Sequence, residues 1–282
     1  MLGKLFKRKP YEIGFALSGG GIKGLCHAGV LKAFEEFDIK PDVIAGVSAG
    51  SIVGALYADG YTPEQILNFF TDISFRQMTT LSFPSLKDIK QEWLSLHTSN
   101  IFAPTGGIFT MDPMENFLRK HLKAKKIEDL PVPLKIVATD LDHGTAKIFE
   151  SGDLVDCIVA SCSMPIIFVP KMIDGVYYVD GGVVQNFPVS TIKDDCQYVV
   201  GVNASPLVVK EYKVSLFSVA QRSYNFMYKA NTIHDKELCD LLIEPSAIGN
   251  FDTFDVDKAK EIYNLGYKTA KRIIKKEYKI NK

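Results

Sequence analysis

The sequence lacks several features that would each indicate a particular class of protein. It has no excess charge, because 33 Lys and Arg residues balance 33 Asp and Glu residues, so the chain does not create the positive field typical of nucleic-acid-binding proteins. No stretch reaches the ~18 uninterrupted apolar residues of a membrane-spanning helix. There is no Gly/Ser-rich or Pro-rich linker, internal repeat or low-complexity segment. With 46% hydrophobic residues, the chain therefore favours one globular domain and no nucleic-acid partner.

Disulfide and metal-ligand patterns are missing as well. The five cysteines are an odd number without a C-x-x-C pair, and the five histidines do not cluster at metal-ligand spacing. The cysteines lie mostly in apolar runs, which predicts reduced thiols and a cytoplasmic protein. We expect neither a metal nor another cofactor.

Both ends of the chain are basic. Residues 1–11 form a segment with four positive charges, at Lys4, Lys7, Arg8 and Lys9. The apolar residues that follow are too few for a signal peptide and include Glu12, so we predict no export. A second basic group lies in the tail at residues 271–282. The two ends could bring the protein to the anionic inner membrane surface, or they could simply be solvated.

Alternating strands and helices predict the fold class. A strand at residues 13–17, a helix at 25–37 and a strand at 43–47 succeed one another, an order that gives parallel strands joined by right-handed crossovers. Further strands are predicted at 134–141, 146–151, 175–182 and 197–204, and further helices at 153–161 and 255–278. We therefore expect a mainly parallel sheet with helices on both faces.

A single small nucleophile stands where an apolar strand meets an apolar helix. Ser48 follows the strand VIAGV, and apolar residues at helical spacing begin at Ile52. In the turn Gly46-Val47-Ser48-Ala49-Gly50, the two glycines remove β-carbons that would collide, and the serine takes a strained conformation that presents its hydroxyl. The alternative is a serine that only caps the helix.

A glycine-rich loop, SGGGIKG at residues 18–24, lies between the first strand and the first helix. Gly19, Gly21 and Gly24 satisfy the G-x-G-x-x-G pattern of a dinucleotide site. That site needs an acidic residue at the end of the next strand, where this chain has Ser48. A phosphate-binding P-loop is also disfavoured, because Leu25 follows Gly24 where a lysine belongs.

The same loop suits the oxyanion of an ester that Ser48 attacks. We predict an oxyanion hole at Gly19, Gly20 and Gly21, with the amides of Gly20 and Gly21 at a helix N-terminus as the donors. Lys23 adds positive potential nearby.

A base for Ser48 is less obvious. His234 is the only histidine late in the chain and lies in an ordinary polar helix, while His27 and His143 sit beside glycine-flanked turns. Asp180 is better placed, because it ends a predicted strand and sites in parallel sheets collect at carboxyl ends of strands. The next two residues, Gly181 and Gly182, allow close backbone approach. The alternative is a hairpin turn at Asp-Gly.

Together these blocks resemble the patatin-like phospholipases. The blocks are GGGIKG at 19–24, GVSAG at 46–50, ASCSMPIIFVP at 160–170 and DGG at 180–182, followed by NFPV at 186–189. The resemblance implies a three-layer α/β/α sandwich over residues 12–282, and a Ser48-Asp180 dyad that cleaves acyl esters of lipids without a metal. It gives supporting roles to Lys23, Gly24, Gly46, Ala49, Gly50, Gly181 and Gly182. Ser18 departs from the family, where an acidic residue is common, and Lys23 replaces a common arginine.

Residues 61–110 form an apolar insert that could cover an acyl-binding groove or belong to the core. We predict a serine acyl hydrolase that acts as a phospholipase, lysophospholipase or lipid esterase, with an acyl lipid as its partner. The alternative is a regulatory or scaffolding protein that uses the same fold to bind partners. The residues indicate neither the ester that is cleaved nor the oligomeric state.

Overall fold

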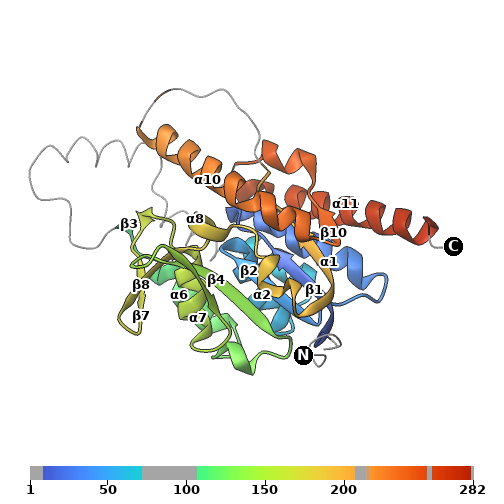
Figure 1. Ribbon diagram of the computed structural model, residues 1–282, viewed down its shortest axis with the longest axis horizontal. Coiled ribbons are helices and arrows are strands. Elements are labelled where there is room, and N and C mark those ends of the chain that lie inside the picture. Colours follow the sequence, from blue (N-terminus) through green and yellow to red (C-terminus); the bar gives the residue numbers. More distant parts are fainter. Residues whose placement is uncertain (1–8, 72–106, 207–213, 215, 253–255, 281–282) are drawn as a thin grey trace, which may run out of the picture.

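A sheet of eight strands forms the centre of the structure, a computed structural model that describes residues 9–71, 107–206, 214, 216–252 and 256–280. The strand order is β10-β9-β1-β2-β4-β8-β7, and β5 pairs with β4 (Figure 1). The strands are β1 Tyr11–Leu17, β2 Val43–Val47, β4 Leu134–Asp140, β5 Thr145–Phe149, β7 Lys171–Ile173, β8 Val176–Asp180, β9 Cys196–Val202 and β10 Leu241–Ile243. Five of them, from β10 to β4, run parallel, which confirms the mainly parallel sheet.

Strands β2 and β8 meet end to end along one edge of β4. β5 pairs antiparallel with residues 136–140 of β4 and takes one edge. On the other edge Val47 of β2 pairs with Val137, and Asp180 of β8 pairs with the next residue, Ala138. Asp180 ends β8, as predicted, but β8 is antiparallel to β4 and does not belong to the parallel strands. It reaches their carboxyl ends from the opposite direction.

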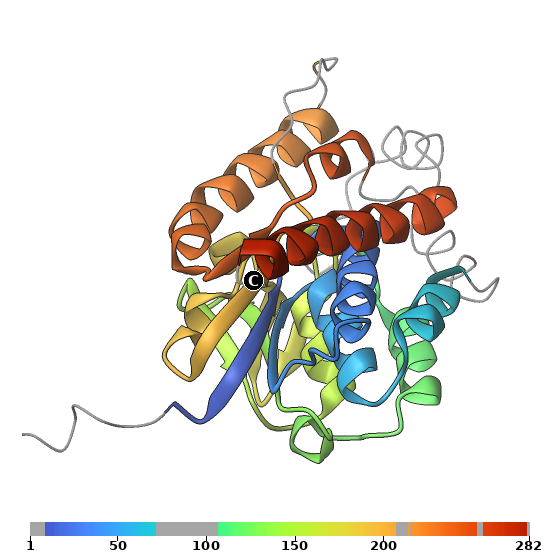
Figure 2. The ribbon, with the colours of Figure 1, turned by 90° about the vertical axis from the view of Figure 1, so that its right-hand side faces the viewer.

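Helices cover both faces of the sheet (Figure 2). Successive residues of a strand point to opposite faces, and Phe15 and Leu17 of β1 lie in a large apolar cluster while Ala16 lies in a smaller one. The large cluster is closed by α1 Leu25–Glu35, α2 Ala49–Ala58, α3 Pro63–Thr71, α6 Asp112–His121, α7 Leu154–Cys162 and α11 Ala259–Ile280. The other side carries α8 Gly182–Gln185, α9 Ser190–Lys193 and α10 Leu216–Leu238. This arrangement confirms the three-layer α/β/α sandwich.

The described parts of the predicted insert at 61–110 lie at its two ends. Ile66, Phe69 and Phe70 of α3 are buried in the large cluster. At the other end, β3 Gly107–Phe109 pairs with β6 Ile166–Phe168 in a separate two-stranded sheet. Residues 72–106, which carry most of the predicted cover over an acyl-binding groove, lie outside the described residues.

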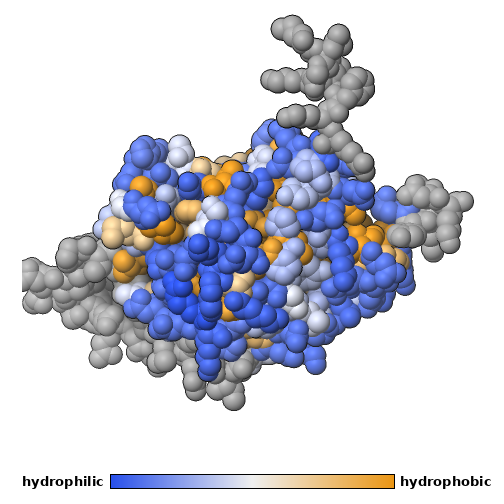
Figure 3. Space-filling view, turned by 90° about the horizontal axis from the view of Figure 1, so that it is seen from below, coloured by the Kyte–Doolittle hydropathy of each residue, from blue (hydrophilic) through white to orange (hydrophobic). Residues whose placement is uncertain are grey.

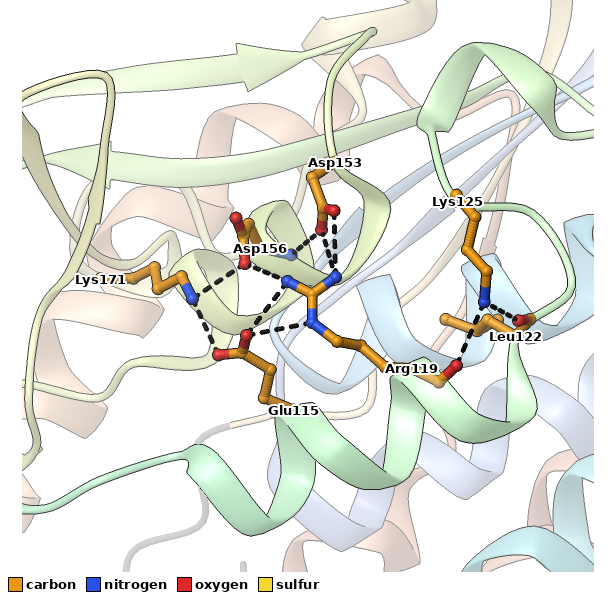
Figure 4. A network of polar contacts seen from close by, with 7 residues as sticks. All are labelled: Glu115, Arg119, Leu122, Lys125, Asp153, Asp156 and Lys171. Atoms are coloured by element: carbon orange, nitrogen blue, oxygen red, sulfur yellow. Dashed lines mark hydrogen bonds and ion pairs between the residues drawn. The ribbon is translucent and has the colours of Figure 1, made fainter.

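An ionic network fixes the beginning of α7 (Figure 4). The guanidinium of Arg119 on α6 binds both carboxylate oxygens of Asp153, at 3.1 and 3.0 Å, and Oδ1 of Asp156 at 2.6 Å. Asp153 also caps α7, because its Oδ1 accepts the N–H of Asp156 at 2.9 Å. Lys171 of β7 binds Glu115 and Asp156, both at 2.8 Å. The network therefore holds α6, α7 and β7 together.

α10 lies over the end at which the parallel strands finish (Figures 1 and 2), and it exposes Val219, Phe226 and Ile233. The face opposite α10 is mainly hydrophilic, with apolar residues in scattered patches (Figure 3).

Two glycines let α1 and α11 pack against each other. A β-carbon at Gly29 of α1 would collide with the carbonyl oxygen of Tyr263, and one at Gly266 of α11 would collide with that of Cys26. These obstacles are backbone atoms, which cannot rotate away as side chains can.

Gly29→Ala should therefore lower the free energy of unfolding by roughly 1–3 kcal/mol, the usual cost of overpacking. Gly54→Ala is the matched control, because a β-carbon there would meet side-chain carbons of Ile44 and Leu134 at 3.1 and 3.2 Å, and its cost should be smaller. Urea denaturation of both variants measures the difference. A Gly29→Ala protein as stable as wild type would contradict this helix contact.

Candidate active site

Ser48 lies in the strained turn that the glycine spacing predicts. It joins β2 to α2 with φ 50° and ψ −122°, a left-handed conformation that is costly for any residue but glycine. A β-carbon at Gly46 would lie 2.6 Å from the carbonyl oxygen of Gly50, and one at Gly50 would collide with that of Leu17. Only glycine fits either position, so the turn presents Ser48 at the end of the sheet as expected.

Two buried serines hold the Ser48 backbone in this conformation. Its N–H donates to Oγ of Ser161 at 2.8 Å, and its carbonyl accepts the Ser51 hydroxyl at 2.6 Å. Neither role follows from local sequence pattern. The block ASCSMPIIFVP, which contains Ser161, indicated the segment but not the contact.

Asp180 lies directly beside Ser48. Its carboxylate accepts a hydrogen bond from the Gly182 amide at 2.7 Å, and the Ser48 side chain lies close enough to lower its pKa. Its backbone is held by the Ser163 carbonyl at 2.9 Å and by the Thr139 hydroxyl at 3.0 Å. Asp180 is followed by α8, so the Asp-Gly sequence forms a strand-to-helix turn and no hairpin.

Asp180 is only 2% exposed, and this burial changes the acidity of its carboxyl group. Loss of water disfavours the charged form and raises the pKa of Asp180 to about 6, although the hydrogen bonds from Gly182 and Ser48 act in the opposite direction. Asp180 is thus a stronger base than an exposed aspartate, yet it is ionised near neutral pH.

The glycine loop lies against the serine turn. A β-carbon at Gly24 would lie 2.6 Å from that of Ala49, the residue after Ser48, and one at Gly19 would lie 3.3 Å from that of Ser48 itself. Gly21 has φ 60°, in the left-handed region that favours glycine. The structure therefore brings the loop and the serine together, as predicted.

The loop is anchored at its first residues. The N–H of Gly19 donates to the Asn186 carbonyl at 3.1 Å, so this amide is already engaged within the protein. Gly20 and Gly21 are partly exposed, as is Lys23. Ser18, the departure from the family pattern, is fully buried, and its hydroxyl accepts the N–H of Ala204 at 2.8 Å.

No histidine among the described residues takes the place of a base for Ser48. His27 is buried, its Nε2 bonds to the Ser18 carbonyl at 2.8 Å, and burial lowers its pKa to about 4. His121 bonds to the Phe117 carbonyl, and His143 and His234 are exposed. His97 lies outside the described residues.

Helix α10 completes the site, which its sequence alone did not suggest. Asn231 of α10 donates to the Gly182 carbonyl at 2.9 Å and accepts the N–H of Asn186 at 3.0 Å. Burial, and then the charge of Asp180, raises the pKa of Tyr224 and Tyr228, so both phenols stay neutral. α10 thus covers the acid and the turn after it.

The described residues were searched for metal sites and for membrane-spanning helices. No group of three or more His, Cys, Asp or Glu side chains in these ranges could hold a metal ion. No helix in them combines the length and apolar character needed to cross a membrane.

Fold and site together define an α/β protein in which a strained serine and a buried aspartate meet at the end of a mainly parallel sheet. The sequence model of one family, described as patatin-like phospholipase, matches residues 15–192. The chain belongs to this family.

Several relatives agree with this assignment. The chain is 25% identical over 293 residues to human patatin-like phospholipase domain-containing protein 6, a match that covers 93% of this chain and 20% of that protein. It is 30% identical over 193 residues to an NTE family protein of Mycobacterium tuberculosis, covering 68% and 47%. The chain thus spans about a fifth of the human relative and about half of the mycobacterial one.

Among solved structures, VipD from Legionella pneumophila is similar with a TM-score of 0.47 and 14% identity, covering 95% of this chain and 67% of that one. ExoU of Pseudomonas aeruginosa in complex with SpcU has a TM-score of 0.45 and 16% identity, covering 96% and 53%.

Burial of Asp180 predicts a stability effect that depends on pH. Because its folded-state pKa is raised, the buried charge destabilises the folded protein above pH 6, and this penalty vanishes as pH falls towards 4. Asp180→Asn should therefore stabilise the protein at pH 8 by roughly 3 kcal/mol, about two pKa units, and at pH 4.5 by only about 1 kcal/mol.

Denaturation curves at both pH values measure this difference. Asp142→Asn is the control, because Asp142 is exposed and its replacement should change little at either pH. If Asp180→Asn gave the same change at pH 8 and pH 4.5, Asp180 would not carry the buried charge.

Proposed function

We propose that the chain is a serine acyl hydrolase that cleaves carboxylic esters of lipids, with Ser48 as nucleophile and Asp180 as base. One observation carries the proposal: the strained Ser48 lies beside the buried Asp180, whose carboxyl group has a raised pKa and interacts with the Ser48 side chain. This is the geometry that a general base requires. Family membership supplies the class of substrate.

In the proposed reaction, Oγ of Ser48 attacks the ester carbonyl while Asp180 accepts its proton. The amides of Gly20 and Gly21 donate to the oxyanion of the tetrahedral intermediate. The intermediate then collapses, Asp180 returns the proton to the leaving alkoxide, and an acyl-enzyme remains. Water, deprotonated by Asp180, attacks this ester and releases the carboxylic acid, while the proton returns to Ser48.

The raised pKa of Asp180 is what makes a dyad workable. An exposed aspartate, with a pKa of ~3.9, is too weak a base to accept a serine proton efficiently near neutral pH. A pKa of about 6 brings the base closer to the operating pH, where proton transfer is most efficient.

A regulatory or scaffolding role without hydrolysis remains the alternative to this proposal. The close contact of Ser48 with Asp180 favours the enzyme, because partner binding alone would not require a strained serine beside a buried acid. Whether phospholipids, lysophospholipids or other lipid esters are cleaved is a question for substrate screening with Ser48→Ala as the blank.

Contact with an anionic membrane through the basic ends stays a prediction. Of the residues concerned, Lys9 donates to the carbonyls of Lys193 and Cys196, both at 2.9 Å, and Lys271 pairs with Glu36 at 2.7 Å. These two ammonium groups already have partners within the protein, so the remaining basic residues would have to provide most of the attraction.

The dyad is tested by turnover of one soluble ester. Asp180→Asn should be almost as inactive as Ser48→Ala, because an amide cannot accept the proton, and kcat/KM of the wild type should fall below about pH 6. His143→Gln and His234→Gln should stay close to wild type. A folded histidine variant as inactive as Ser48→Ala, beside an active Asp180→Asn protein, would instead establish a triad.

The oxyanion hole is tested at Gly21. A side chain at φ 60° should twist the loop and misdirect the amides, so Gly21→Ala should lower kcat by ~100-fold or more. Gly175→Ala is a matched control: its φ is 82°, nothing lies within 4 Å of the added carbon, and it lies in the turn between β7 and β8. Full turnover by a folded Gly21→Ala protein would remove the loop from the mechanism.

A further inference from the structure

The Ser161 hydroxyl joins two elements that build the active site. Ser161 lies near the end of α7 and is fully buried. Its Oγ accepts the N–H of Ser48 at 2.8 Å and donates to the carbonyl of Val137 in β4 at 2.6 Å. The strained peptide of Ser48 is therefore tied to the neighbouring strand through one side chain.

This use of a helical serine is unusual. A serine inside a helix commonly donates to the carbonyl one turn earlier, and Ser163 does so, with its hydroxyl 2.8 Å from the Val159 carbonyl. The Ser161 hydroxyl makes neither of these two hydrogen bonds within its own helix. It donates to β4 and accepts from the Ser48 turn. Its contacts therefore serve the serine turn rather than the helix.

The same turn of α7 also holds the acid. The carbonyl of Ser163 accepts the N–H of Asp180 at 2.9 Å, and that of Ser161 accepts the N–H of Gly181 at 3.4 Å. Ser48 and Asp180 come from strands that meet end to end, and α7 contacts both where they meet. The end of α7 thus sets the position of one relative to the other.

We infer that Ser161 is a positioning residue of the Ser48-Asp180 pair, acting through the Ser48 N–H to keep the Ser48 hydroxyl on the Asp180 carboxylate. The inference rests on the proposed function. Without the Ser161 hydroxyl, the buried N–H of Ser48 and the carbonyl of Val137 both lose a partner. The turn can then relax from its strained conformation and carry Oγ away from the base.

Ser161→Ala tests this with kinetics on a soluble ester. We expect kcat to fall at least about tenfold while KM changes less than about twofold, because the hydroxyl acts on alignment and touches no substrate. The acid limb of the pH profile should also move to higher pH, because the Ser48 hydrogen bond holds down the pKa of Asp180. A purely structural role would not move this limb.

Cys157→Ala is the matched control, because Cys157 lies on the same helix, is buried and loses a side-chain atom of similar size. Its kcat and pH profile should match wild type. If Ser161→Ala does not fold, Ser161→Cys keeps the size with weaker hydrogen bonding and should shift kcat and the acid limb in the same directions.

Two results would overturn the inference: a folded Ser161 variant with wild-type kcat and pH profile, or an equal loss of kcat in Cys157→Ala. The Ser48→Ala variant distinguishes failure of the Ser161 inference from failure of the proposed hydrolase function. If Ser48→Ala kept its turnover, the proposed function itself would fail.

Discussion

Two strands that approach each other head-on along a single edge of β4 impose the constraint on which the site depends. Val47 and Asp180 pair with adjacent residues of β4. The two strands therefore end almost at the same point, and the chain must turn away from the sheet there in both cases. Only sharp turns allow this. A β-carbon at Gly181 would collide with the Val137 carbonyl, as those at Gly46 and Gly50 would with other backbone atoms. Gly181 is thus a consequence of this crowded junction, whereas Gly46 and Gly50 are required by contacts within the serine turn and with Leu17 of β1.

The same crowding determines the chemistry. Where two strand ends, α7, the glycine loop and α10 converge, little water remains around Asp180, and its carboxylate keeps only the few hydrogen bonds that neighbouring groups offer. Burial of this carboxylate lowers the stability of the folded protein and makes the group more basic, a combination that is common at functional sites. α10 takes part in this burial although the family match ends at residue 192, before α10 begins.

The site was more predictable from sequence than its surroundings, for a physical reason. Close backbone approach requires glycine, so the turns at Ser48 and Asp180 leave a compositional trace that can be read locally. The direction of β8 leaves none, because it depends on pairing with β4 about 40 residues away along the chain. Hydrogen bonds between distant elements, such as those of Ser161 and Asn231, are equally invisible to periodicity. Hence Ser48 and Asp180 could be named from the sequence, but not the contacts that hold them.

The head-on junction also bears on how the chain folds. Its parts come from residues 43–47, 134–140 and 161–182, together with α10. Long stretches of chain separate these segments, and bringing their ends together costs conformational entropy. A nascent chain that has made only β1, β2 and α2 contains Ser48 but lacks both Asp180 and the Ser161 hydroxyl that holds the Ser48 turn. Under the proposed function, such a chain would not hydrolyse nearby lipids until its C-terminal half has been synthesised and has paired, so turnover would report complete folding.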